Sequence, residues 1–359
     1  MRHTERMGSA LTTIGLPVAL GIIMFGLGLT LTPRDFARVA RQPKAVIIAL
    51  ICQIVVLPAL CFALVVLFRL PPVLAVGMLL LAASPGGTTA NLYSHLFRGD
   101  VALNISLTAI NSVLAVFTLP LITNLAIAYF LPGDDSLGLQ LAKVVEVFII
   151  VLGPVVLGML ARWWRPSFAD RMDRPVRIAS VVILVVVIAG AIASNLELLL
   201  ENAGRLAGVT VVFCVLSLTV GYMVPRLLRV DRRQSIASSF EIGIHNATLA
   251  IVIAQTVIGS VEMSLPAAVY GVLMFFVALA FGFLIRGRGA GTSAGGATDA
   301  TATSSTAGTD VAAADAAASN PLVADAAVAD AAVSDAAVSD AAVSDAAPGA
   351  TRSEAPPER

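Results

Sequence analysis

The sequence is dominated by apolar runs that are each long enough to cross a lipid bilayer as a helix. A bilayer core about 30 Å thick needs about 20 apolar residues in α-helical form. Nine such runs follow one another along the chain, at residues 11–31, 43–68, 73–97, 101–131, 138–162, 175–196, 204–228, 233–257 and 263–286. They predict an all-α membrane protein with about nine transmembrane helices, joined by connections of typically five to fifteen residues.

The composition agrees with a chain that lies mostly in lipid. Apolar residues make up 58% of the chain and charged residues only 13%, whereas a soluble domain carries about 25% charged residues. This excludes an ordinary cytosolic enzyme, a nucleic-acid-binding protein and a secreted disulfide scaffold. The three cysteines lie inside apolar runs, at spacings that fit neither a disulfide framework nor a transition-metal site, so we expect them to be buried small hydrophobes.

The positions of the charged residues predict an orientation in the cell membrane. Basic residues follow the odd-numbered runs, and the loop after the fifth run contains Arg162, Arg165, Arg171, Arg174 and Arg177. The alternate loops instead contain acids, at Asp134, Asp135, Glu197, Glu201 and Glu262. Because cytoplasmic loops are enriched in lysine and arginine, we expect a multi-pass protein with its N-terminus outside and its C-terminal tail in the cytoplasm.

Three segments are expected along the chain. Residues 1–10 form a short N-terminal segment, residues 11–288 the transmembrane domain, and residues 289–359 a tail. The tail repeats a Val-Ala/Ser-Asp-Ala-Ala unit five times between Val323 and Ala347, and it holds ten acids against two arginines. Because the repeat has no apolar side chain larger than valine to bury, we expect a disordered, acidic, low-complexity tail.

Two of the nine runs contain residues that do not suit an unbroken membrane helix. The third run includes SPGGTTAN at 84–91, and the eighth includes EIGIHN at 241–246. Pro85 removes a backbone donor, and a charged residue such as Glu241 costs about 2.5–3.5 kcal/mol at the bilayer centre on insertion scales. Non-helical backbone at that depth persists only where protein buries it or where it lines a watered cavity. One such break in each half of the chain points to an inverted-repeat secondary transporter.

A pair of breaks of this kind can hold ions of both signs. The free N–H groups of a half-helix attract an anion, while carbonyl and side-chain oxygens can hold a small cation. The alternative is a pair of kinked packing helices in which Asn91 and Glu241 are hydrogen-bonded to their neighbours.

Several stretches resemble the bile acid:sodium symporter family in one consistent order. They are 21–36 (GIIMFGLGLTLTPRDF), 53–58 (QIVVLP), 84–91, 98–108 (RGDVALNISLT) and 241–246, and the resemblance covers about residues 15–288. It implies the nine-span version of a fold with two domains. Spans 1, 5 and 6 would form a panel domain, and spans 2, 3, 4, 7, 8 and 9 a core domain in which the discontinuous third and eighth spans cross.

The resemblance also implies one or two Na⁺ ions. The family's first sodium site falls on Asn91, Asn104, Thr108 and Glu241, with Ala90 in place of a serine. The second falls on Gln53, Glu241, the carbonyl groups of Ile242 and Ile244, and His245. The family has a glutamine where this chain has His245, and a hard cation prefers oxygen ligands. The histidine could instead keep Glu241 ionised, contact substrate, bring in proton coupling, or form a hydrogen bond across the crossing.

The substrate-contacting positions implied by the resemblance are Gly87, Thr88, Thr89 and Asn246. We therefore expect a sodium-coupled symporter for an organic anion, either a small carboxylate or a bile-acid-like molecule, that works by alternating access. A proton-coupled or uncoupled carrier is the alternative. An oxyanion efflux carrier would need a thiol in the first break, and an intramembrane enzyme would need a HExxH or G-x-S-x-G motif in a span. The first break has no cysteine, the sequence has no HExxH motif, and its G-x-S-x-G match at 291–295 lies in the low-complexity tail. No feature of the sequence indicates an oligomeric state.

Overall fold

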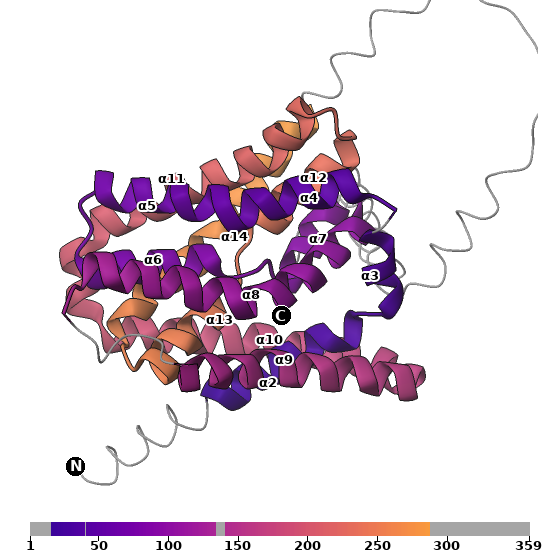
Figure 1. Cartoon of the computed structure of the whole chain (residues 1–359), viewed down its shortest axis with the longest axis horizontal. Helices are drawn as coiled ribbons and strands as arrows, with labels where there is room; N and C mark the ends of the chain where they lie inside the picture. The colour runs from indigo at the N-terminus through magenta and orange to yellow at the C-terminus, as the bar shows by residue number, and fades with distance from the viewer. Residues whose placement is uncertain (1–15, 40, 134–140, 288–359) are drawn as a thin grey trace, which may run out of the picture. The chain divides into compact units, whose positions relative to one another are not determined.

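The computed structural model describes residues 16–39, 41–133 and 141–287 (Figure 1). Regular structure in these ranges is helical, without a named strand. Among the described residues, five helices are long and apolar enough to cross a membrane, namely Pro43–Leu67, Val101–Phe130, Pro166–Ser194, Leu196–Leu227 and Glu262–Arg286. The all-α membrane class expected from the sequence is therefore confirmed. The expected N-terminal segment 1–10 and tail 289–359 lie outside the described residues.

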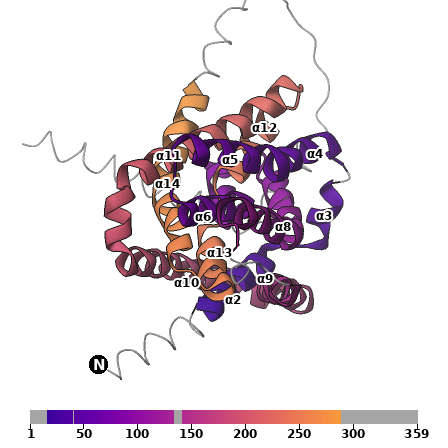
Figure 2. The same cartoon turned by 60° about the vertical axis from the view of Figure 1, so that its left-hand side comes forward.

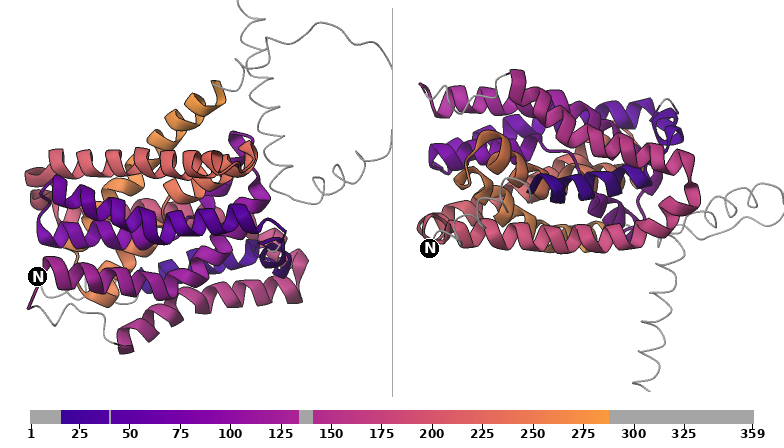
Figure 3. Two further views of the ribbon diagram at one scale, coloured as in Figure 1. Left: turned by 45° about the horizontal axis from the view of Figure 1, so that its top comes forward. Right: turned by 90° about the horizontal axis from the view of Figure 1, so that it is seen from below.

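Three helices form one packed group. They are α2 (Leu16–Thr30), α9 (Leu141–Trp164) and α10 (Pro166–Ser194), and each packs against the other two (Figures 1 and 2). In Figure 3 the indigo α2 lies beside the long pink α10. A glycine on each side lets the backbones of α2 and α9 approach closely. A Cβ on Gly28 would lie 2.2 Å from the Val155 carbonyl oxygen, and one on Gly158 would lie 2.4 Å from that of Phe25.

The remaining helices pack around two interrupted ones. The helices α4 (Pro43–Ile51) and α5 (Leu57–Leu67) run as one rod through the π-helical turn η2 (Cys52–Val56), as Figure 1 shows. The helix α8 (Val101–Phe130) packs against α6 (Pro72–Ala83), and α11 (Leu196–Leu227) against α12 (Arg232–Gly243) and α14 (Leu265–Gly287). The short α3 (Pro33–Val39) contacts α8, and the 3-10 turn η4 (Glu262–Ser264) precedes α14.

The two interruptions fall inside the segments that the sequence singles out. The first separates α6 from α7 (Thr88–Leu96). The second separates α12 from α13 (Ala247–Val252), which continues into the π-helical turn η3 (Ile253–Ile258). Both α6 and α12 contain 12 residues.

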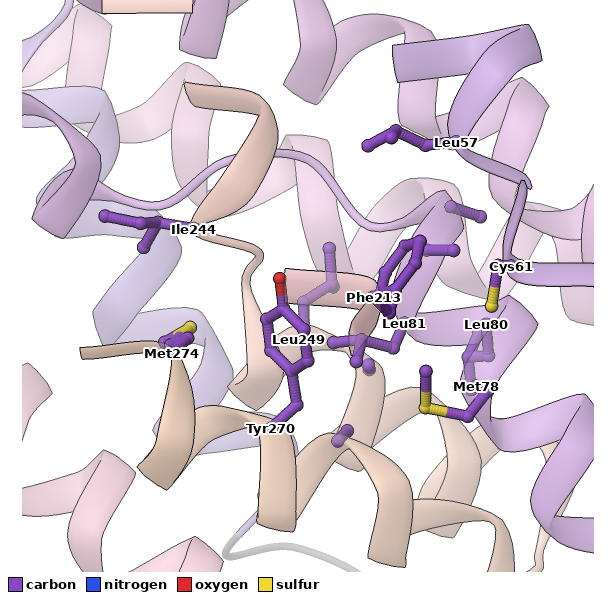
Figure 4. Packing of buried hydrophobic residues seen from close by; sticks show 14 of the residues in the cluster. Leu57, Cys61, Met78, Leu80, Leu81, Phe213, Ile244, Leu249, Tyr270 and Met274 are labelled. Carbon is purple, nitrogen blue, oxygen red and sulfur yellow. The ribbon is translucent and has the colours of Figure 1, made fainter. Parts of the chain in front are cut away.

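Large apolar side chains from many of these helices meet in one buried cluster. Met78 and Leu81 of α6, Phe213 of α11 and Tyr270 of α14 all belong to it (Figure 4). Tyr270 is completely buried, and its hydroxyl group donates to the Gly243 carbonyl oxygen at 2.8 Å. The cluster therefore supports the last residue of α12, directly before the second break.

Two helices begin earlier than the apolar runs predict. The run at 175–196 belongs to a helix that starts at Pro166, and the run at 204–228 belongs to one that starts at Leu196. Single residues, Arg165 and Asn195, join these helices to the helices before them. The expected connection of five to fifteen residues is wrong at both places, and Arg171 and Arg174 lie on α10 rather than in a loop. Hydropathy locates the lipid-embedded part of a helix. The helix itself can extend into water for as many residues as form helical backbone hydrogen bonds.

Adding one methyl group at Gly158 tests the close contact between α2 and α9. We expect Gly158→Ala to destabilise the protein by about 1–3 kcal/mol, because the new Cβ meets backbone atoms that cannot move aside. Gly153→Ala is the matched control on the same helix, since nothing lies within 4 Å of its Cβ position. Thermal unfolding of the purified protein in detergent measures both variants. Equal melting temperatures for the two would contradict this account of the contact.

Candidate functional site

The two helix interruptions meet and pair through their backbones. Gly86 and His245 form an isolated antiparallel bridge. The Gly87 N–H group donates to the Ile244 carbonyl oxygen at 3.3 Å, and the Asn246 N–H group donates to that of Pro85 at 2.9 Å. Each interruption thus provides hydrogen-bond partners for backbone groups of the other that have no partner within a helix. Backbone groups at membrane depth need such partners from the protein, because water does not supply them there.

Proline sets the position of the first break. A residue that precedes proline is disfavoured in the helical region, and Ser84 is accordingly extended, with ψ of 144°. Its hydroxyl group turns back and donates to the Leu81 carbonyl oxygen at 2.7 Å, near the end of α6. Gly87 is also extended, and α7 begins directly after it.

Side-chain capping and a histidine contact shape the second break. The Asn246 side-chain oxygen accepts the Leu249 N–H group at 3.0 Å and so caps α13. The His245 ring nitrogen Nδ1 lies 3.2 Å from the Ser84 carbonyl oxygen on the opposite break, and the ring stacks on Phe213 at a centroid distance of 5.5 Å. The histidine therefore forms a hydrogen bond across the crossing.

The carboxyl group of Glu241 lies directly beside this crossing and is 0% exposed. Thr108 Oγ1 donates to its Oε2 at 2.5 Å, and Asn111 Nδ2 donates to its Oε1 at 3.1 Å. Gly86 leaves room for it, because a Cβ there would lie 2.5 Å from the carboxyl carbon. The carboxyl group is thus hydrogen-bonded from α8 and packed against the first break, which is the kind of partnering that a buried acid needs.

Two asparagines, one on α7 and one on α8, have buried oxygens without a donor in the described part of the chain. Asn104 Nδ2 donates to Ser94 Oγ at 2.7 Å and to the Ala237 carbonyl oxygen at 2.8 Å, which links α8 to α7 and α12. Among the described residues, no hydrogen-bond partner reaches Asn104 Oδ1 or Asn91 Oδ1. Asn104 lies one helical turn before Thr108. The two unpartnered oxygens thus come from α7 and α8, and α8 also carries Thr108, which contacts the carboxyl group.

Gln53 approaches the first break from the π-helical turn of the second span. Its Nε2 donates to the Ser84 carbonyl oxygen at 3.0 Å, and its Oε1 is buried without a partner in the described part of the chain. A pocket lies beside it, lined by Gln53, Ala83, Pro85, Asn111 and Thr118 together with apolar side chains.

The other residues singled out from the sequence lie around the same crossing. Ile242 and Ala90 are buried, and the carbonyl group of Ile244 is occupied by the Gly87 N–H group. Thr89 is half-buried at the start of α7. The side chain of Thr88 lies outside the described residues.

Asn111, which is not among the site residues expected from the sequence, contacts the buried acid directly. The polar residues 104, 108 and 111 are spaced i, i+4 and i+7 within an apolar run, so they share one face of α8. A polar stripe inside a membrane span indicates a face that looks into the bundle. That spacing is the signal that identifies Asn111.

Comparison with known proteins finds a family model and several relatives for this sequence. The sequence model described as the sodium bile acid symporter family matches residues 17–202. An uncharacterized sodium-dependent transporter of Bacillus subtilis, YocS, is 29% identical over 72% of this chain and 78% of its own length.

Two chloroplast proteins are also similar. The probable sodium/metabolite cotransporter BASS2 of rice is 29% identical over 76% of this chain and 64% of its own length. The probable sodium/metabolite cotransporter BASS1 of Arabidopsis thaliana is 31% identical over 71% of this chain, which spans 62% of that relative. The family match covers more than half of the chain and includes the first break, so the resemblance expected from the sequence is confirmed: the chain belongs to the sodium bile acid symporter family.

Proposed function

We propose that this protein is a secondary active transporter that carries an organic anion together with Na⁺ by alternating access. The observation that carries the proposal is the antiparallel pairing of two helix breaks beside a buried carboxyl group. Broken helices that present backbone groups and ion ligands at one point are the design of secondary transporters. Relatives named as sodium-dependent or sodium/metabolite transporters support the same function.

The ion ligands come from three elements around the first break. We assign the first Na⁺ to Asn91, Asn104, Thr108 and Glu241. The two unpartnered asparagine oxygens support this assignment, since a buried oxygen without a donor favours a cation. A second ion would use Gln53 and Glu241, with the carbonyl groups of Ile242 and Ile244 close by. His245 faces the Ser84 carbonyl oxygen with one ring nitrogen, so we assign it to holding the crossing together rather than to contacting sodium.

The packing supports a division into two moving parts. We assign α2, α9 and α10 to the panel domain, as spans 1, 5 and 6, because they pack against one another. The core domain would contain the two interrupted helices and the other spans of a nine-span chain. With the arginine-rich ends in the cytoplasm, the N-terminus lies outside the cell and the tail inside.

The anion would bind where α7 begins. Gly87, Thr88, Thr89 and Asn246 are the positions that we assign to it. Space for a ligand is available at Gly87, since no atom lies within 4 Å of its Cβ position. A bound Na⁺ neutralises Glu241 and fixes the unwound backbone, which lowers the free-energy cost of adding an anion. Rocking of the panel against the core would then expose the site to each side in turn.

Replacing the buried acid by its amide tests the ion assignment. Glu241→Gln keeps the shape of the side chain but removes the charge that holds the cation. We expect sodium-stimulated uptake of labelled organic acids into proteoliposomes to fall by about tenfold or more, equivalent to about 1.4 kcal/mol of lost coupling. Glu262→Gln, on an exposed residue of η4, is the control and should keep normal uptake. Full sodium stimulation in Glu241→Gln, or uptake driven equally well by a pH gradient alone, would refute sodium coupling through this acid.

Two adjacent glycines provide a second test, of the crossing itself. We expect Gly86→Ala to lower the stability by about 1–3 kcal/mol, because its Cβ would lie 2.5 Å from the Glu241 carboxyl group and 2.7 Å from the Glu241 carbonyl oxygen. Gly87→Ala should leave the melting temperature unchanged, since its Cβ position is open and its backbone is extended. Thermal unfolding measures both variants. A Gly86→Ala protein as stable as the Gly87→Ala protein would argue against the tight packing of the acid on the first break.

A further inference from the structure

The pocket beside the first break contains two buried amide oxygens without donors. Gln53 and Asn111 are only 4% and 3% exposed, and both line this pocket. No hydrogen-bond partner reaches Gln53 Oε1 or Asn111 Oδ1 within the described residues. They come from separate elements, the π-helical turn η2 and the helix α8.

The contacts of each amide fix which end faces the pocket. Gln53 Nε2 lies 3.0 Å from the Ser84 carbonyl oxygen and 3.4 Å from that of Ala82. Asn111 Nδ2 lies 3.1 Å from Glu241 Oε1. The two backbone carbonyl oxygens only accept, and so does the ionised Glu241 carboxylate, so in each amide the NH₂ end has to face them. The carbonyl oxygen of each amide is thereby the end left without a donor.

We propose that Asn111 is a ligand of a cation held between Gln53 Oε1 and Asn111 Oδ1 in this pocket. This inference rests on the proposed function. At the second ion, Asn111 would supply the side-chain oxygen that the family's glutamine supplies and that His245 lacks. Asn111 also contacts Glu241, so the same side chain joins the cation to the buried acid.

Three features of the pocket favour a cation. Ala83, the last residue of α6, lines it, and the carboxyl end of a helix carries partial negative charge. Side-chain amide oxygens are among the ligands that hard cations take in proteins, and this pocket has two of them. His245 cannot supply an oxygen, and its Nδ1 already faces the Ser84 carbonyl oxygen.

Counting bound sodium ions tests the proposal without any organic substrate. The experiment measures equilibrium binding of radioactive ²²Na⁺ to the purified full-length chain, in buffer with choline in place of other cations. We expect about two ions per chain for the natural sequence. Asn111→Leu, Gln53→Leu and the double variant should each bind about one ion, with equal affinity for it, because both side chains hold the same cation. Asn124→Leu replaces an amide elsewhere on α8 and should bind about two.

The result also separates a ligand from a residue that only positions the acid. If Asn111 served only Glu241, Asn111→Leu would weaken every bound ion and the double variant would be worse than either single one, which would overturn the proposal. An Asn111→Leu protein that still binds two ions would overturn it as well. Asn111→Ser, which withdraws the oxygen from the pocket but keeps a hydroxyl group, replaces Asn111→Leu if that variant does not fold. The ion count also separates this inference from the proposed function. If the natural sequence binds one ion, and neither Gln53→Leu nor Asn111→Leu changes that number, the inference fails while sodium coupling stands. If the natural sequence binds no sodium ion, the inference and the proposed sodium coupling both fail.

Discussion

The structure depends on the satisfaction of backbone groups where two helices lose their own hydrogen bonds. Inside a bilayer, water is not there to replace a missing bond, and each unsatisfied group costs several kcal/mol. The bonds from Gly87 to Ile244 and from Asn246 to Pro85 meet this requirement mutually. Neither break is favourable alone, which explains why the motif at 84–91 needs a partner at 241–246.

The same requirement governs the polar side chains around the crossing. Glu241 has donors on two sides, and His245, Gln53 and Ser84 connect the breaks to each other and to the second span. Within the described residues, four amide oxygens of the expected sites and the adjoining pocket have no donor, on Asn91, Asn104, Asn111 and Gln53. Amide oxygens can only accept, so a positively charged ligand would supply the partner that these four lack.

Different parts of the molecule were predictable to different degrees. The helical class and both breaks follow from hydropathy and from the residues themselves, since proline forces Ser84 to be extended and Asn246 is a strong helix cap. The start of α10 at Pro166 was not predictable, because the helix extends past its apolar run. Contacts between distant segments were also hidden. Only the fold shows that Asn111 reaches Glu241 and that His245 reaches Ser84, as these pairs are far apart in the sequence.

The equal lengths of α6 and α12 have an electrical consequence. At 1.5 Å per residue, 12 helical residues extend about 18 Å, a little more than half of a hydrocarbon core about 30 Å thick. The antiparallel bridge means that the two half-helices arrive from opposite directions. A cation travelling from either surface to the crossing would therefore traverse roughly half of the membrane voltage, about 1.2 kcal/mol per 100 mV. Loading from outside and unloading to the inside would then each be driven by about half of the resting potential.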